Sequence, residues 1–191
     1  MNLLIIFISA VLINNFVFYY FLGLCPYLGV SRKIGPSISM GMAVTFVLSL
    51  TAVSSWMINH WILIPFGLDY LQIVSFILVI ASLVQLVEMF IRKISPPLYQ
   101  AMGIYLPLIT TNCVIMGLAL LAALKNYNFL ETVVFGVSAG IGFTLAIVLM
   151  AAIREQLELA DVPRPLRGAA IALITAGIIS LAFMGFSGII K

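Results

Sequence analysis

Six apolar runs, each long enough to cross a lipid bilayer as a helix, constrain this chain more than any other feature. About 20 apolar residues suffice to cross about 30 Å of hydrocarbon. The chain is 64% hydrophobic and 8% charged, whereas a soluble domain carries about 25% charged residues. Its polar surface is too small to cover a globule in water. The runs are Leu3–Leu24, Ile34–Ile58, Leu71–Ile91, Leu98–Leu124, Leu130–Ile153 and Gly168–Ile190.

The pattern predicts an all-α integral membrane protein with six transmembrane helices in a single membrane domain, residues 1–191. The segments between the runs are short and leave no room for a soluble module. The first run has no Lys or Arg before it and no small-residue cleavage site of a secretory signal. We therefore expect it to remain in the membrane as a helix.

The basic residues predict the orientation of the chain. With six crossings, seven of them fall on one side of the membrane and two on the other. The positive-inside rule then places both termini on the non-cytoplasmic side of the cell inner membrane. The basic residues form short clusters rather than a stripe with exposed aromatics, so lipid is the expected surrounding and nucleic acid is not an expected partner. The larger set is Arg32, Lys33, Arg92, Lys93, Arg154, Arg164 and Arg167, and the smaller is Lys125 and Lys191.

The first and fourth runs are too long for simple helices. Residues 3–31 and 95–124 are uncharged stretches of 29 and 30 residues. As straight helices each would be about 45 Å long, well beyond the hydrocarbon core. Both contain residues that break helices, so the first and fourth helices are predicted to be interrupted. The expected breakers are Gly23, Pro26 and Gly29 in the first, and Gly103, Pro107 and Gly117 in the fourth.

The two interrupted helices hold the same place in each half of the chain. Short similarities also relate the halves: 12–15 resembles 108–112, and 41–45 resembles 140–144. Three helices in each half would make the second an inverted copy of the first, with repeats of about 1–94 and 95–191. Interrupted helices at matching positions of inverted repeats indicate a site within the membrane. Gly136 and Gly140, a GxxxG pair, predict close helix packing.

Cys25 and Cys113, the only cysteines, each fall in one of the interrupted helices. Inversion of the halves would bring both thiols close to a common axis. The residues alone leave three roles open: buried packing residues, a disulfide, or ligands of a metal centre. Iron–sulfur clusters usually take four thiolates, so a cluster here would need two more ligands from another subunit.

The remaining residues add few chemical candidates. Walker A, Rossmann, zinc-protease and CxxC motifs are absent from the sequence, so any nucleotide or haem step would belong to another chain. Polar residues beside the breaks are expected to cap freed backbone groups, or else to line a cation path. They are Asn14, Asn15, Thr110, Thr111 and Asn112.

Several motifs resemble the NqrDE/RnfAE family, the membrane subunits of the Rnf (Rsx) ion-translocating electron-transport complex and of the sodium-pumping NADH:quinone oxidoreductase. The resemblance covers essentially the whole chain, and Asn14-Asn15 and Cys25-Pro26 favour its RnfA (RsxA) branch. The motifs are 14–17, 21–26, 95–99, 108–113, 160–163, 168–177 and 181–188.

The resemblance implies a component of a redox-driven ion translocase with no complete active site of its own. The complex would pass electrons between ferredoxin and NAD while moving Na⁺ or H⁺. In the family the cysteines matching Cys25 and Cys113 hold half of an intramembrane [2Fe–2S] cluster, and the other half comes from an RnfE-like homologue of opposite orientation. Further expected partners are RnfB, RnfC, RnfD and RnfG. The alternatives are a secondary transporter-like subunit without a redox role, and an inert assembly scaffold.

Overall fold

The computed structural model describes residues 3–67, 71–94, 108–109, 111–160, 163 and 166–188. These residues form helices and turns, and no strand occurs among them, which confirms the all-α prediction. The long helices are α3 Ile34–Ile58, α5 Gln72–Ile94 and α9 Phe129–Leu159. The shorter elements are α1 Leu3–Ile8, the π-helical turn η1 Ser9–Ile13, α2 Leu24–Val30, the π-helical turn η2 Asn59–Leu63, α4 Ile64–Phe66, α8 Cys113–Leu124, α10 Ala169–Met184 and the 3₁₀ turn η6 Gly185–Gly188.

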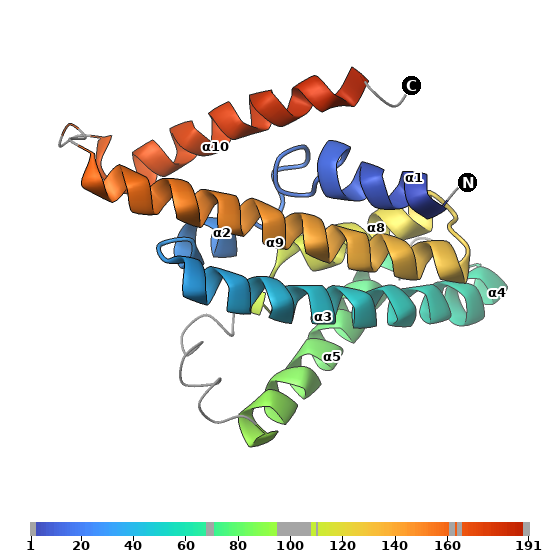
Figure 1. Cartoon of the computed structure of the whole chain (residues 1–191). Coiled ribbons are helices and arrows are strands. Elements are labelled where there is room, and N and C mark those ends of the chain that lie inside the picture. The colour runs from blue at the N-terminus through green and yellow to red at the C-terminus, as the bar shows by residue number, and fades with distance from the viewer. Residues whose placement is uncertain are drawn as a thin grey trace.

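Helices α3 and α9 run antiparallel, side by side, through the middle of the molecule (Figure 1). Small residues let their backbones approach closely. A Cβ atom added to Gly140 would lie 2.7 Å from the Thr45 Cα, and one added to Gly136 would lie 2.7 Å from the Ala52 Cβ. The GxxxG pair therefore packs against α3, as predicted.

The two segments of internal similarity, 41–45 and 140–144, meet at this crossing. Thr45 donates to the Gly41 carbonyl at 2.8 Å and Thr144 to the Gly140 carbonyl at 2.9 Å, while the two hydroxyl oxygens are 3.2 Å apart. A Cβ on Gly41 would lie 2.5 Å from the Thr144 Cγ2, and one on Gly140 would lie 2.6 Å from the Thr45 Cγ2. These reciprocal contacts form a local twofold arrangement. The repeat over residues 1–94 and 95–191 stays a prediction.

The first predicted helix is interrupted, but the break begins earlier than the predicted breakers. The helix of α1 and η1 ends at Ile13, and the chain is not helical again until Leu24. Of the three expected breakers only Gly23 lies outside a helix, whereas Pro26 and Gly29 lie inside α2. Pro26 is the third residue of α2, where a backbone N–H has no partner within the helix, so proline is tolerated there.

The fourth helix is described from its second part onward. Residues Leu108 and Ile109 are helical, and α8 begins after a non-helical Asn112. Gly103 and Pro107 lie outside the described residues. Gly117 was predicted to break the helix and does not, since it lies inside α8, where an added Cβ would lie 2.5 Å from the Leu22 Cδ1. Its small size lets α8 pack against the break in the first helix.

Within the described ranges, three continuous helical stretches are long and apolar enough to cross a membrane, namely Ile34–Leu63, Gln72–Met89 and Phe129–Leu159. Shorter apolar stretches, Leu3–Ile13, Cys113–Leu124 and Ala169–Met184, coincide with the first, fourth and sixth predicted runs. The number of membrane crossings remains a prediction.

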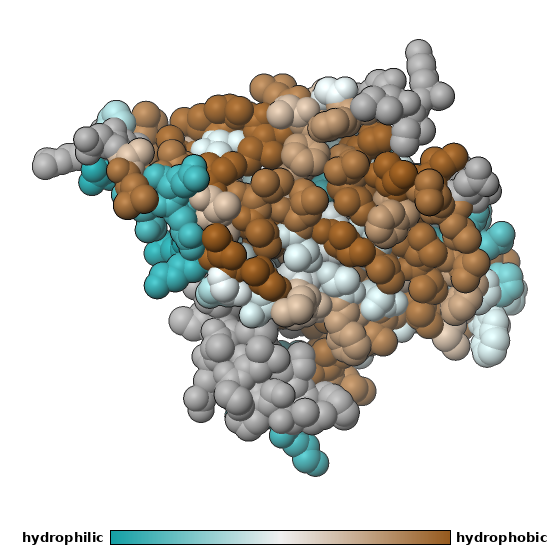
Figure 2. Space-filling model, viewed as in Figure 1, coloured by the Kyte–Doolittle hydropathy of each residue, from teal (hydrophilic) through white to brown (hydrophobic). Residues whose placement is uncertain are grey.

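The face of the molecule shown in Figure 2 is predominantly apolar, with hydrophilic residues gathered toward its edges. Large apolar side chains point outward, including Met42, Leu78 and Leu181, which are 62%, 65% and 71% exposed. Monomeric soluble proteins rarely expose apolar patches this extensive. The distribution fits a molecule surrounded by lipid and by other membrane proteins.

Candidate functional site at the two interrupted helices

Asn15 stabilises the break in the first helix. Its side chain is fully buried, and its Oδ1 accepts a hydrogen bond from the Val17 backbone N–H at 3.0 Å. Its Nδ2 donates to the Val11 carbonyl at 3.0 Å and to the Gly142 carbonyl at 2.9 Å. Non-helical backbone within a membrane must satisfy its polar groups inside the protein. Asn15 does so and also ties the break to α9.

The rest of the break, residues 16–23, is held from several directions. The Leu22 N–H donates to the Phe16 carbonyl at 2.9 Å, and the Ser180 hydroxyl of α10 donates to the Phe18 carbonyl at 2.6 Å. Ser180 was not anticipated from the sequence, because a small polar residue within an apolar run resembles an ordinary packing residue. It connects the last helix to the break in the first.

Asn112 has an equivalent place before α8. Its Oδ1 accepts from the Val114 N–H at 3.1 Å, the same two-residue spacing as the bond from Asn15 to Val17. The predicted capping role is therefore confirmed for both asparagines. The Asn112 Nδ2 atom is buried and has no hydrogen-bond partner in the described part of the chain.

Gly23 joins the two breaks. Its φ of +75° is a left-handed conformation that residues other than glycine rarely adopt. A Cβ added there would lie 2.6 Å from the Val114 Cγ2 and 3.2 Å from the Asn112 Oδ1. Gly23 directly precedes α2, and Asn112 and Val114 flank the first residue of α8. The beginnings of the two helices are thus in contact through Gly23.

Each cysteine lies at one of these helix beginnings, because Cys25 is the second residue of α2 and Cys113 is the first of α8. The structure therefore brings together the two cysteine-bearing segments. Both thiols are free and both residues are exposed. Neither cysteine is a buried packing residue, and the two do not form a disulfide.

The helix beginnings also suit an anionic group. Backbone N–H groups at a helix N-terminus carry a positive partial charge that favours negative charge nearby. Metal-bound cysteine is a thiolate, so a sulfur ligand at either position would lie beside these N–H groups. Two exposed thiols on adjoining segments would supply half of a four-thiolate site.

Comparison with known proteins places this arrangement in a family. The chain matches the family described as "Rnf-Nqr subunit, membrane protein" over residues 3–190. It belongs to the Rnf-Nqr family. A relative from Serratia proteamaculans, named as one of the subunits of an ion-translocating oxidoreductase complex, is 60% identical over 188 residues, which is 98% of this chain and 97% of the relative. Relatives of the same name from Edwardsiella ictaluri and Yersinia pseudotuberculosis are 57% identical over the same shares. The Rnf-Nqr assignment confirms the resemblance seen in the sequence motifs.

Proposed function

We propose that this Rnf-Nqr protein is a membrane component of a ferredoxin:NAD oxidoreductase complex that couples electron transfer to the movement of Na⁺ or H⁺. The relatives that are 57–60% identical carry the name of an ion-translocating oxidoreductase complex. Electrons would enter and leave the complex through other subunits, which resemble RnfB, RnfC, RnfD and RnfG. The complex would lie in the cell inner membrane, with both termini of this chain on the non-cytoplasmic side.

Within that complex, Cys25 and Cys113 supply two thiolate ligands to a [2Fe–2S] cluster, and an RnfE-like homologue of opposite orientation supplies the other two. The observation that carries this proposal is the contact between the two helix beginnings that carry free, exposed cysteines. Each of these helices starts inside one of the long apolar runs of the sequence. The two ligands would therefore face a partner protein within the membrane. When bound, such a cluster accepts one electron and passes it on.

The surrounding residues of this chain position the two ligands. Gly23 keeps the start of α2 against Asn112 and Val114, so both cysteines are held by one junction. Asn15 and Asn112 satisfy the freed backbone, which allows the chain to be non-helical beside the cysteines. Buried apolar residues behind the junction, including Phe143 and Val114, exclude water from its inner side.

The proposal is tested in membrane vesicles that contain the complete complex, with Cys25→Ser, Cys113→Ser and the double variant. We expect each single variant to abolish electron transfer between ferredoxin and NAD, together with the ion uptake that depends on it. The double variant should be no worse than either single one, since the two residues act as one site. The amount of assembled complex in each membrane is the control.

Other outcomes separate the competing functions. Normal electron transfer with normal ion uptake in the double variant would contradict the ligand role and favour a scaffold. Ion movement that persists without electron transfer would favour a transporter-like protein.

A further inference from the structure

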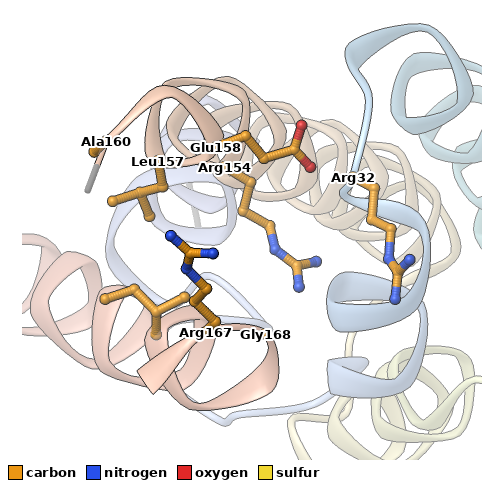
Figure 3. A pocket seen from close by; sticks show the side chains of 8 residues that line it. Arg32, Arg154, Leu157, Glu158, Ala160, Arg167 and Gly168 are labelled. Carbon is orange, nitrogen blue, oxygen red and sulfur yellow. The ribbon is translucent and has the colours of Figure 1, made fainter. Parts of the chain in front are cut away.

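A second polar feature lies where α9 ends and α10 begins, beside the turn that follows α2. A cavity of about 430 Å³ opens there, lined by three arginines, Arg32, Arg154 and Arg167. Figure 3 shows that they come from three segments: the turn after α2, the last turns of α9 and the residue before Gly168. The proposed electron-transfer function does not use this pocket.

Among the described lining residues the positive charge exceeds the negative charge. Glu158 is the one acidic side chain among them, against three guanidinium groups. Arg154 of α9 and Arg32 of the turn after α2 line the same cavity. Like charges held together in one cavity are unfavourable unless an anion lies between them.

Arg154 is fixed in its place. Its Nη1 donates to the Leu28 carbonyl at 2.7 Å and to the Ser31 hydroxyl at 3.0 Å, which ties α9 to the end of α2. A guanidinium has five N–H donors, so these bonds leave others to face the cavity. The Arg32 side chain, in contrast, is exposed and has no hydrogen-bond partner within the described residues.

The beginning of α10 adds backbone donors to the same cavity. Gly168 lines the pocket and precedes α10 with a φ of +96°, and no side chain of the described residues caps the helix there. The first N–H groups of this 16-residue helix are therefore available to an anion. Arginine forks together with a helix N-terminus are the donor arrangement that best recognises a phosphate group.

We propose that this pocket binds a phosphate group, that of an anionic phospholipid. Apolar Leu157 and Ile171 line the cavity beside the arginines, as the junction between a headgroup and its acyl chains requires. The surrounding surface toward the middle of the molecule is apolar (Figure 2). The positive-inside rule places this end at the cytoplasmic leaflet, where anionic lipids attract basic residues.

The test is native mass spectrometry of the purified full chain titrated with dioleoyl phosphatidylglycerol, with dioleoyl phosphatidylcholine and with inorganic phosphate. The variants are Arg32→Gln and Arg167→Gln. Lys33→Gln is the matched control, because it removes the same charge next to Arg32 at a residue that does not line the pocket. Arg154→Gln is left out, since it would also release the end of α2.

We expect phosphatidylglycerol to bind more tightly than phosphatidylcholine, with a loss of roughly five- to tenfold in each arginine variant. Lys33→Gln should bind phosphatidylglycerol like the wild type. If inorganic phosphate binds tightly and loses affinity in the same arginine variants, the pocket is a phosphate site, but its ligand is not a phospholipid. Equal binding of the two lipids, unchanged binding in both arginine variants, or an equal loss in Lys33→Gln would overturn the proposal.

Discussion

Gly23 is the residue on which the geometry of the cysteine pair most directly depends. In Gly23→Ala, the new methyl group would be forced onto Val114 in a left-handed backbone. We expect a loss of roughly 2–4 kcal/mol in stability, from backbone strain and overpacking together. The measurement is thermal stability of the purified complex, read by size-exclusion chromatography after heating.

Gly67→Ala is the matched control, because Gly67 also has a left-handed φ, +61°, but an added Cβ meets no atom of the described residues within 4 Å. This variant should lose only the stability that backbone strain costs, roughly 1–2 kcal/mol. If both variants lose the same stability, the contact between Gly23 and Val114 does not matter.

The sequence predicted which residues matter at the site better than it predicted the contacts that these residues make. Cys25, Cys113, Asn15 and Asn112 were singled out because polar or reactive residues are rare in apolar runs. The partner of Asn15, the Gly142 carbonyl, and the bond from Ser180 were not, since backbone acceptors and distant contacts leave no mark in sequence. The exposure of both thiols was also visible only in the fold.

Among the elements, the crossing of α3 and α9 holds the two halves of the chain together. Gly140→Leu would place a large side chain against the Thr45 backbone and force the helices apart. We expect the complex to lose roughly 1–3 kcal/mol or more, or to fail to assemble. The amount of assembled complex in the membrane measures this.

Gly177→Leu in α10 is the control for that substitution, because an added Cβ at Gly177 meets nothing within 4 Å. Normal assembly of Gly140→Leu, or equal damage from both variants, would show that close approach of α3 and α9 is unnecessary.

The sequence predicted these elements to different degrees. Helix α3 begins at the predicted Ile34, after two basic residues, but the helical stretch continues past the predicted Ile58 through η2 to Leu63, because Asn59 and His60 do not end it. Helix α9 continues to Leu159, beyond the predicted Ile153. The charged residues Arg154, Glu155 and Glu158 end the apolar run of the sequence but do not end the helix. The first break was predicted in part, since Gly23 lies in it, but it begins further upstream at Asn14, and Pro26 fits the first turn of α2.

The molecule as a whole presents two exposed cysteines at the junction of the first and fourth helices. Under the proposed function the chain supplies half of a ligand set, and a second protein of the complex would cover this face. The basic end of the molecule has a different proposed task, lipid binding, which should be unaffected by loss of the cysteines.

The central claim is that Cys25 and Cys113 bind one shared cluster. The most direct measurement is EPR spectroscopy, with iron and sulfide analysis, on the purified complex of the wild type, Cys25→Ser and Cys113→Ser. We predict that each variant assembles but loses the same [2Fe–2S] signal and about two iron atoms per complex. An unchanged signal and iron content in both variants would contradict this claim.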